Sequence, residues 1–209
     1  MSLKTRFGNL GNILDFDNLT EENIYVLDSP ILTNSQFKKF KKFFSKKVKI
    51  IDCTFDIEKS LKERIDLIRE EAETAVREGA TCLVLSDKNI SNQKASIPSI
   101  LTVGAVHSHL VKHGLRGYCS LNVECSDAMD THSFAILIGV GATTVNPYLA
   151  IDSIYQRFEK KLFGKSDFEG CVKKFKKSID AGLLKIMSKM GISVISSYRG
   201  GCNFEAVGL

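Results

Sequence analysis

The 209-residue sequence lacks several patterns that would assign it to a common class. It contains no apolar run approaching the roughly 18 to 20 residues that a bilayer span needs, and no basic-then-apolar secretion signal at its N-terminus. Its six cysteines are spread along the chain without a Cys-x-x-Cys pair, the spacing typical of zinc and iron–sulfur ligands. We therefore expect a cytoplasmic protein with no membrane contact and no cysteine-bound metal.

Phosphate-binding and nucleophile patterns are missing as well. The sequence has neither a G-x-G-x-x-G loop nor the Lys-Ser/Thr ending of a nucleotide loop. Gly139-Val140-Gly141 precedes its expected strand, whereas a dinucleotide loop follows one. A reactive thiol needs an electropositive, accessible setting, and Cys202 near Arg199 is the only arguable case. We predict no catalytic residue in this chain.

Positive charge is concentrated in two predicted helices, and the formal net charge is +5. In the first helix, Phe37, Phe40 and Phe44 recur at helical spacing and form one apolar face, with lysines on the other side. A nucleic-acid interface would need exposed aromatic side chains beside the lysines. We therefore predict a core-packed helix with a solvated lysine surface and no nucleic-acid partner, and interpret the lysines of 173–177 in the same way.

Glycines divide the chain into repeating units. A composition of 44% hydrophobic and 25% charged residues suits one well-packed domain. Gly79, Gly114, Gly141 and Gly191 each end a helical pattern and precede an apolar or β-branched run, as expected of residues that stop a helix in the left-handed conformation. The pattern of helix, glycine and strand is typical of an α/β protein.

Strands are expected at 49–55, 81–86, 118–124, 143–146 and 192–196, and helices at 57–78, 98–113, 131–140, from 147, and at 167–190. Elements of this length build a sheet with helical crossovers. We predict an α/β fold of about five mostly parallel strands alternating with helices, as an open sheet or a partial β/α barrel, since a closed barrel needs eight strands. Residues 26–209 would form this single domain. Residues 1–25 would form a flexible leader, and residues 1–3 are a candidate for a short sequence added during cloning.

Polar side chains follow several of these strands, and the carboxyl ends of parallel strands form the functional edge of α/β sheets. Together these residues would make a polar rim able to hold a small zwitterion or anion. The alternative is that they only cap the next helices. The candidate rim residues are Ser86, Asp87, Glu124 and Asn146.

The sharpest single candidate is the turn Tyr198-Arg199-Gly200-Gly201, which follows the last expected strand. A strand, a glycine turn and a helix start aim backbone N–H groups at an anion, with an arginine beside them. We expect this turn to join the same rim, as a candidate anion site or interdomain contact. Arg199 could instead pair with Glu205 or contact another domain.

Three histidines lie on one predicted helix. His109 and His113 share a face, whereas His107 points elsewhere. Two ligands on one helix without a third do not define a zinc site, so we predict no metal.

Three long blocks of the sequence carry a resemblance to a known family. They are LDSPIL from Leu27, IPSILTVGAVHSHLVKHGLR from Ile97 continuing through SLNVE to ILIGVGATTVNPYLA, and GLLKIMSKMGIS followed by SSYRGG and FEAVGL. Their order and spacing resemble the central domain of the glutamate synthase large chain over nearly the whole sequence. The family has close to HHH where this chain has His107-Ser108-His109, and close to RGAQIFEA from Arg199 onwards, so roles of the replaced residues do not carry over.

The resemblance implies a connecting role in a larger enzyme. In the family an amidotransferase domain releases ammonia from glutamine, and a tunnel leads the ammonia to 2-oxoglutarate, where a flavin reduces the resulting 2-iminoglutarate. The chain would link the amidotransferase and FMN domains, wall the tunnel, stop before the FMN barrel and be inactive alone. FMN and an iron–sulfur cluster would belong to the parent enzyme, with a small-subunit reductase or ferredoxin as electron donor. The competing hypothesis is a self-contained α/β protein that binds a small molecule or anion through the Arg199 loop.

Overall fold

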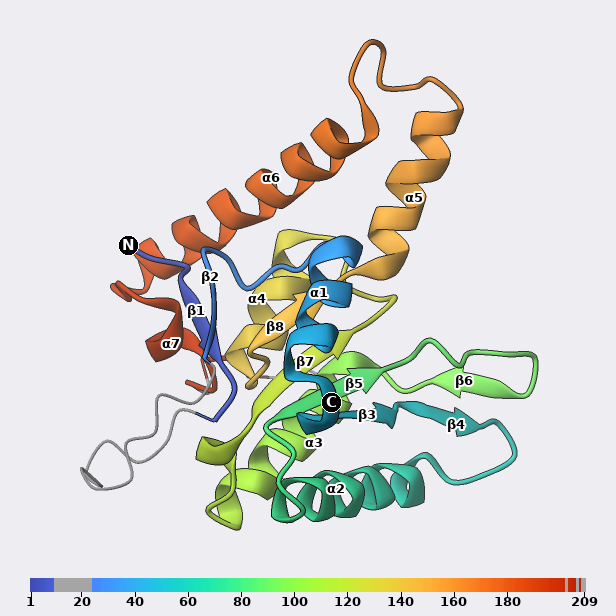
Figure 1. Cartoon of the computed structure of the whole chain (residues 1–209), viewed down its shortest axis with the longest axis vertical. Helices are drawn as coiled ribbons and strands as arrows, with labels where there is room; N and C mark the ends of the chain where they lie inside the picture. Colours follow the sequence, from blue (N-terminus) through green and yellow to red (C-terminus); the bar gives the residue numbers. More distant parts are fainter. Residues whose placement is uncertain (10–23, 202, 206, 208–209) are drawn as a thin grey trace.

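Four apolar segments form a parallel sheet at the centre of the molecule. In the computed structural model, which describes residues 1–9, 24–201, 203–205 and 207, the strands follow the order β3 (Val48–Asp52), β5 (Cys82–Ser86), β7 (Ser120–Glu124) and β8 (Thr144–Asn146) (Figure 1). Every residue of β5 and β7 is buried, as expected of parallel strands covered on both faces. Ile31 adds a single parallel bridge beside Val145. The predicted class, α/β with mostly parallel strands alternating with helices, is confirmed.

Helices connect these strands at the positions that the glycines indicate. They are α2 (Leu61–Arg77), α3 (Ser99–Lys112) and α4 (Thr131–Gly139). Gly79, Gly114, Gly141 and Gly191 all have positive φ angles, of 95°, 70°, 126° and 69°. The prediction that these four residues stop helices is confirmed.

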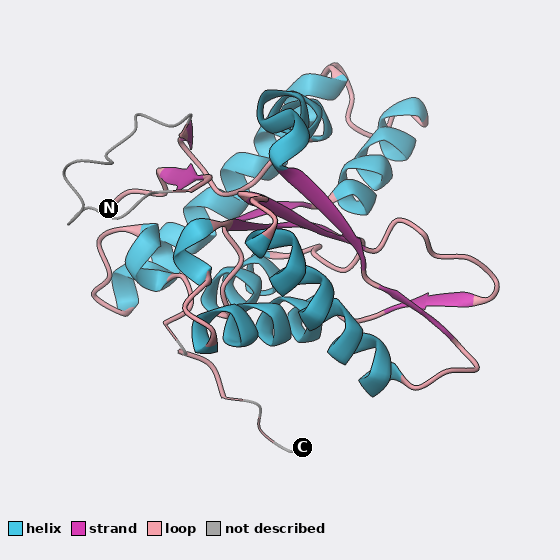
Figure 2. Cartoon of the chain, turned by 60° about the horizontal axis from the view of Figure 1, so that its bottom comes forward, coloured by secondary structure: helices cyan, strands magenta, loops and turns pink. Residues whose placement is uncertain are grey.

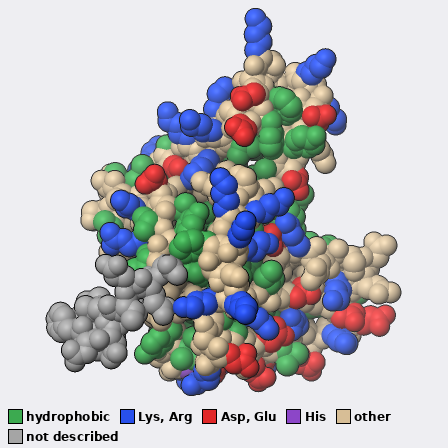
Figure 3. Space-filling model, in the orientation of Figure 1, with side chains coloured by type: hydrophobic (Ala, Val, Ile, Leu, Met, Phe, Trp, Pro, Cys, Tyr) green, Lys and Arg blue, Asp and Glu red, His purple; other side chains and the backbone are tan. Residues whose placement is uncertain are grey.

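Alternate side chains of β5 face two different apolar layers. Leu83 and Leu85 belong to the larger core, which includes residues of α2 and α3. Cys82 and Val84 pack instead against α1 (Asn34–Phe44), through the predicted stripe of Phe37, Phe40 and Phe44. The sheet is therefore sandwiched between helices (Figure 2), and the lysines of α1 lie on the outer surface (Figure 3).

The last three helices extend from the edge of the sheet beside β8. α5 (Tyr148–Glu159) and α6 (Phe168–Lys189) form a hairpin whose tip projects away from the body (Figure 1). The end of α6 returns to the core through Leu183 and Met187, which are almost fully buried. α7 (Ile195–Tyr198) follows.

One expected strand is wrong. Residues 192–196 do not join the sheet: Val194 makes an isolated bridge to Ser2, and α7 begins at Ile195. Burial of Ile195 and Tyr198 on one side of this turn overrides the strand preference of the β-branched residues. The Arg199 turn therefore does not follow a strand of the parallel sheet.

The predicted flexible leader is wrong for residues 1–9. β1 (Thr5–Phe7) pairs antiparallel with β2 (Tyr25–Leu27), and the Phe7 ring is 1% exposed against Phe40 and Phe44. Residues 10–23 lie outside the described residues. A second antiparallel pair, β4 (Thr54–Asp56) with β6 (Lys94–Ser96), extends beyond the carboxyl ends of β3 and β5.

Candidate functional site

Four predicted site residues lie together at the carboxyl ends of the parallel strands. Ser86, Glu124 and Asn146 are consecutive partners in the strand register, and Asp87 follows Ser86 directly. We call this set the carboxyl-end rim. All four are buried, with at most 6% of each residue exposed.

The carboxyl-end rim is bonded almost completely within the chain. Ser86 Oγ donates to Glu124 Oε2 at 2.7 Å, and Lys88 Nζ lies 2.8 Å from Glu124 Oε1. Asp87 Oδ2 accepts hydrogen bonds from the backbone N–H and the hydroxyl of Ser126, at 2.9 and 2.6 Å. Asp87 Oδ1 is the buried rim oxygen that lacks a partner in the described part of the chain.

Asn146 also serves the fold. Its side-chain N–H groups donate to the Leu32 carbonyl at 2.9 Å and to Asn34 Oδ1 at 3.0 Å. These bonds hold the segment before α1 against the end of β8. The side-chain N–H groups of Asn146 are therefore occupied by bonds within the fold.

Tyr148 borders the carboxyl-end rim from the first turn of α5. Burial and the nearby Asp87 carboxylate raise the pKa of this phenol above its ordinary value, so it remains protonated. Lys88 Nζ lies 5.0 Å from the centre of the Tyr148 ring. The rim thus holds two carboxylates, one lysine and a neutral phenol, which suits internal bonding better than anion binding.

A basic cluster lies at the opposite, amino-terminal end of the same strands. Arg116, in the short 3-10 helix η3 (Arg116–Tyr118), donates to the carbonyls of Cys119 and Gly141 at 2.6 and 2.9 Å, just before β7 and β8. Its Nε donates to His107 Nδ1 at 3.1 Å. We call His107, Arg116 and Arg199 the amino-end basic cluster.

The His107 ring is wedged between two glycines. A Cβ atom at Gly200 would lie 2.8 Å from the ring, and one at Gly141 would collide with it. Burial and then the charges of Arg116 and Arg199 lower the pKa of His107 to about 4. The imidazole is therefore neutral at physiological pH and accepts the hydrogen bond from Arg116.

Arg199 differs from Arg116 in having no bonding partner in the part of the chain that the structure describes. Its Nε is buried without a hydrogen bond, and its guanidinium forms no ion pair or hydrogen bond among the described residues. Burial and then the charge of Arg116 lower the pKa of Arg199 to about 10. Both arginines, together with Arg6, Ser120 and Thr143, line a cavity of about 60 Å³.

The structure therefore corrects the predicted position of the Tyr198-Arg199-Gly200-Gly201 turn, which lies at the amino ends of the strands rather than in the carboxyl-end rim. Gly200 N donates to the Ile138 carbonyl at the end of α4, and Tyr198 Oη donates to the Ala135 carbonyl at 3.1 Å. The tail after Gly201 is not helical at its described residues, and no ion pair joins Arg199 to Glu205 there. The turn anchors the tail on α4.

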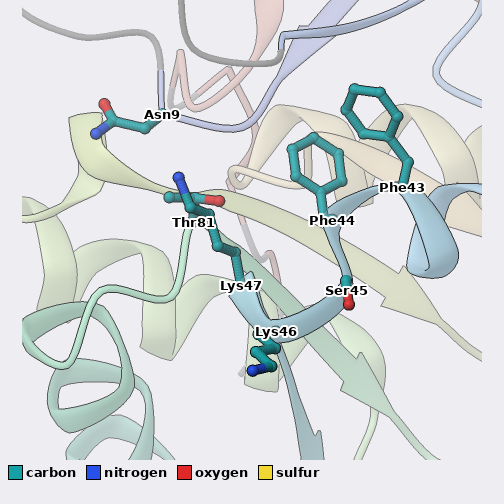
Figure 4. A pocket seen from close by; sticks show the side chains of 7 residues that line it. All are labelled: Asn9, Phe43, Phe44, Ser45, Lys46, Lys47 and Thr81. Carbon is teal, nitrogen blue, oxygen red and sulfur yellow. The ribbon is translucent and has the colours of Figure 1, made fainter.

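Further hollows lie along the same amino-terminal edge. One, of about 280 Å³, is lined by the end of α1, the 3-10 helix η2 (Ser45–Lys47), Asn9 and Thr81 (Figure 4). The next shares Asn9, Lys47 and Thr81 with it and extends to Arg77, Leu115 and Tyr118. The amino-terminal edge is thus the hollow and basic end of the sheet.

Three important residues were missed or undervalued from sequence. Arg116 and His107 come together only because α3 and the turn after it fold back onto β7. Glu73 on α2 lies beside His109 although 36 residues separate them. For Arg116, the sequence did offer one indication of its role: this arginine comes two residues after Gly114, which stops α3.

Comparisons with known proteins agree on one family. The model of the glutamate synthase central domain matches residues 1–209. The chain belongs to this family. It is 52% identical over its whole length to the NADPH glutamate synthase large chain of Azospirillum brasilense, and 42% identical over 88% of its length to that of Bacillus subtilis. A ferredoxin-dependent glutamate synthase of Pyropia yezoensis is 39% identical over the whole chain.

The match is confined to a small part of these relatives. The glutamate synthase central domain described here spans 14% of the Azospirillum brasilense protein and 12% of the Bacillus subtilis protein. Among solved structures, a mutant flavocytochrome b2 with benzoylformate has a similar fold, with a TM-score of 0.51 and 14% sequence identity. The superposition covers 84% of this chain and 41% of the flavocytochrome chain. That likeness shows a shared fold. No helix in the described ranges is long and apolar enough to cross a membrane.

Proposed function

We propose that this chain is the central connecting domain of a glutamate synthase, linking the amidotransferase and FMN domains and helping to wall the ammonia tunnel. The parent enzyme would be an oxidoreductase acting on CH–NH2 donors that converts glutamine, 2-oxoglutarate and two electrons into two glutamates. Electrons would come from a small-subunit reductase or from ferredoxin, since NADPH-, NADH- and ferredoxin-dependent names all occur among the relatives. Family membership supports this proposal.

FMN and the iron–sulfur cluster would lie in the other domains. Flavin enzymes with β/α folds use the carboxyl ends of the strands, yet here a flavin phosphate would meet the buried carboxylates of Asp87 and Glu124, which repel it. Cys53, Cys82, Cys119, Cys125 and Cys171 are buried, and none of them joins a group of three or more potential metal ligands among the described residues, whereas a cluster needs several cysteines together. The residues present fit neither group, and we derive no chemical step through them.

The observation that carries the proposal is the unmatched charge of the amino-end basic cluster. The Nε of the half-buried Arg199 is itself buried, and among the described residues its guanidinium has neither an acid nor a carbonyl to bond. A cation in such a position is unfavourable until a partner is supplied. A neighbouring domain that supplies a carboxylate or backbone carbonyls at this edge would complete its bonding. We therefore assign the hollow amino-terminal edge to the contact with the adjoining domains.

The test uses the whole large chain with Arg199→Ala. Loss of the contact should lower glutamine-dependent glutamate synthesis by about tenfold or more, because truncating one partner of a buried charged contact typically costs 2–5 kcal/mol. Glutamine hydrolysis and glutamate synthesis from added ammonium should persist, since their catalytic groups lie in other domains. Arg69→Ala, at a half-exposed position on α2 where the side chain pairs with Asp66 of the same helix, is the control. Unchanged glutamine-dependent synthesis in Arg199→Ala would remove the cluster from the interdomain contact.

One observation favours a second candidate, a self-contained anion-binding protein: the cavity of about 60 Å³ is lined by three arginines. Calorimetric titration of the 209-residue chain with 2-oxoglutarate, glutamate and phosphate separates the two functions. The connecting domain should bind none of them. Binding well below millimolar that Arg199→Ala abolishes would establish the second function.

A further inference from the structure

A separate polar cluster lies on the surface seam between α2 and α3. Glu73 Oε2 is 2.6 Å from His109 Nε2 and 3.9 Å from His113 Nδ1. The two imidazole rings lie 4.3 Å apart. Three side chains from two helices thus converge on one point.

The packing of the two helices explains this convergence. The apolar faces of α2 and α3, including Ala72, Val76, Val106 and Leu110, are buried in the common core, and the two helices lie side by side beneath the sheet (Figure 2). Glu73 and His109 each neighbour one of these buried residues and so lie at the seam. His113 is one helical turn after His109 and shares its face.

The donor set is that of a divalent transition metal site. Two imidazoles and a carboxylate bind zinc in many proteins, with a further position left to water. Each of Glu73, His109 and His113 offers a ligand atom within 4.8 Å of the other two. Their side chains are 22%, 20% and 35% exposed, so an ion in solution can reach them.

Neighbouring groups orient two of the three ligands. Arg77 holds Glu73 Oε1 at 2.8 Å, which leaves Oε2 turned toward the histidines. His113 Nδ1 lies 2.8 Å from the His109 carbonyl. This contact holds the His113 ring beside His109, with Nδ1 3.9 Å from Glu73 Oε2.

We propose that Glu73, His109 and His113 bind a divalent transition metal ion of the zinc class and thereby clamp α3 to α2. The predicted absence of a metal site rested on the lack of a third ligand beside the two histidines, and Glu73 is that ligand. The seam is separate from the amino-end basic cluster. The inference does not depend on the connecting role of the chain.

Calorimetric titration of Zn²⁺ into the chelator-treated chain tests the proposal. We expect one ion bound per chain, and a melting temperature raised by about 5 °C when free Zn²⁺ is a hundredfold above the dissociation constant. His113→Ala should weaken binding by at least about tenfold, because it removes a direct ligand. The substitution is at an exposed residue, so the fold should persist.

Two further variants make the result decisive. Glu73→Gln keeps an oxygen for Arg77 but removes the charge, and should also weaken binding about tenfold. His132→Ala alters an exposed histidine outside the cluster and should bind like the unaltered chain. Cobalt should give d–d bands without a thiolate-to-cobalt charge-transfer band. Absence of binding, equal affinity in His113→Ala and Glu73→Gln, or a thiolate band would each overturn the proposal.

Discussion

The two ends of the central sheet are both polar, but their charges are balanced in opposite ways. At the carboxyl-end rim, Glu124 bonds to Ser86 and to the cation Lys88, and Asp87 bonds to Ser126 through one oxygen while its other oxygen lacks a partner among the described residues. At the amino-end basic cluster, Arg116 is bonded to backbone carbonyls, whereas the buried Nε of the half-buried Arg199 has no hydrogen-bond partner among the described residues. The comparison teaches that polar residues at strand ends indicate a contact with something outside the chain only where their charge is not matched inside it.

The largest effect should come from the close packing around His107. Gly141 has a φ of 126°, and its Cβ position is occupied by the His107 ring. Gly141→Ala combines backbone strain with a steric clash and should lower the free energy of unfolding by about 4 kcal/mol. Urea denaturation of the 209-residue chain measures this loss.

The double variant Gly141→Ala with His107→Ala is the control. It removes the clash but keeps the strained φ angle, so it should regain about half of the lost stability. No regain would show that the ring does not set the spacing at this end of the sheet. Gly79→Ala has a positive φ but no atom within 4 Å of its Cβ, and should cost only about 1 kcal/mol.

The second prediction contrasts the two arginines. Arg116→Ala removes four hydrogen bonds, three of them to the buried residues Cys119, Gly141 and Thr143, and should cost about 3 kcal/mol of unfolding free energy. Arg199→Met replaces a half-buried cation that has no partner among the described residues with an apolar side chain of similar length. It should leave the isolated chain equally stable, or up to about 1 kcal/mol more stable. Equal large losses in both variants would show that the charge of Arg199 is matched within the chain.

Local sequence patterns predicted the helices and the parallel strands well. The glycine stops and the apolar strands depend on neighbouring residues, and β5, β7 and β8 differ from their expected ranges by one or two residues. The antiparallel pairs β1–β2 and β4–β6 were not predicted, because strands of three residues depend on partners distant in sequence. Residues 192–196 show the reverse error, where burial in the core replaced an expected strand by a helical turn.

The candidate site was also predicted only in part from the sequence. Ser86, Glu124 and Asn146 could be placed together because parallel strands align their carboxyl ends. Their bonding to Lys88, Asn34 and Leu32 could not be predicted, since it depends on side-chain directions. Arg199 was assigned to the wrong end of the sheet because its expected strand does not exist.

The third prediction concerns pH and the amino-end basic cluster. Burial, Arg116 and Arg199 lower the pKa of His107 from 6.5 to about 4. The unfolded chain therefore binds a proton before the folded chain does, and stability should fall as the pH drops from 6.5 toward 4. We expect His107 to contribute about 2 kcal/mol to this loss, after allowing for its partial exposure.

His107→Gln isolates this contribution, since glutamine does not titrate and can still accept a hydrogen bond from Arg116. The unfolding free energies of the variant and the unaltered chain should converge by about 2 kcal/mol between pH 7 and pH 4. His132→Gln, at an exposed position, should leave the profile unchanged. Parallel profiles for His107→Gln and the unaltered chain would contradict a depressed pKa at His107.

The smallest effect should appear at Glu124 of the carboxyl-end rim, whose charge is matched by Lys88. Glu124→Gln keeps an oxygen to accept from Ser86 but weakens the contact with Lys88, whose side chain is 49% exposed and can turn to solvent. The expected loss is about 1 kcal/mol in urea denaturation. Lys88→Met leaves the buried Glu124 carboxylate unpaired and should lose about 3 kcal/mol. The double variant should lose only about as much as Glu124→Gln alone, because the unpaired charge is gone. Additive losses would mean that Glu124 is held by groups other than Lys88, and its charge would then not be matched by that residue.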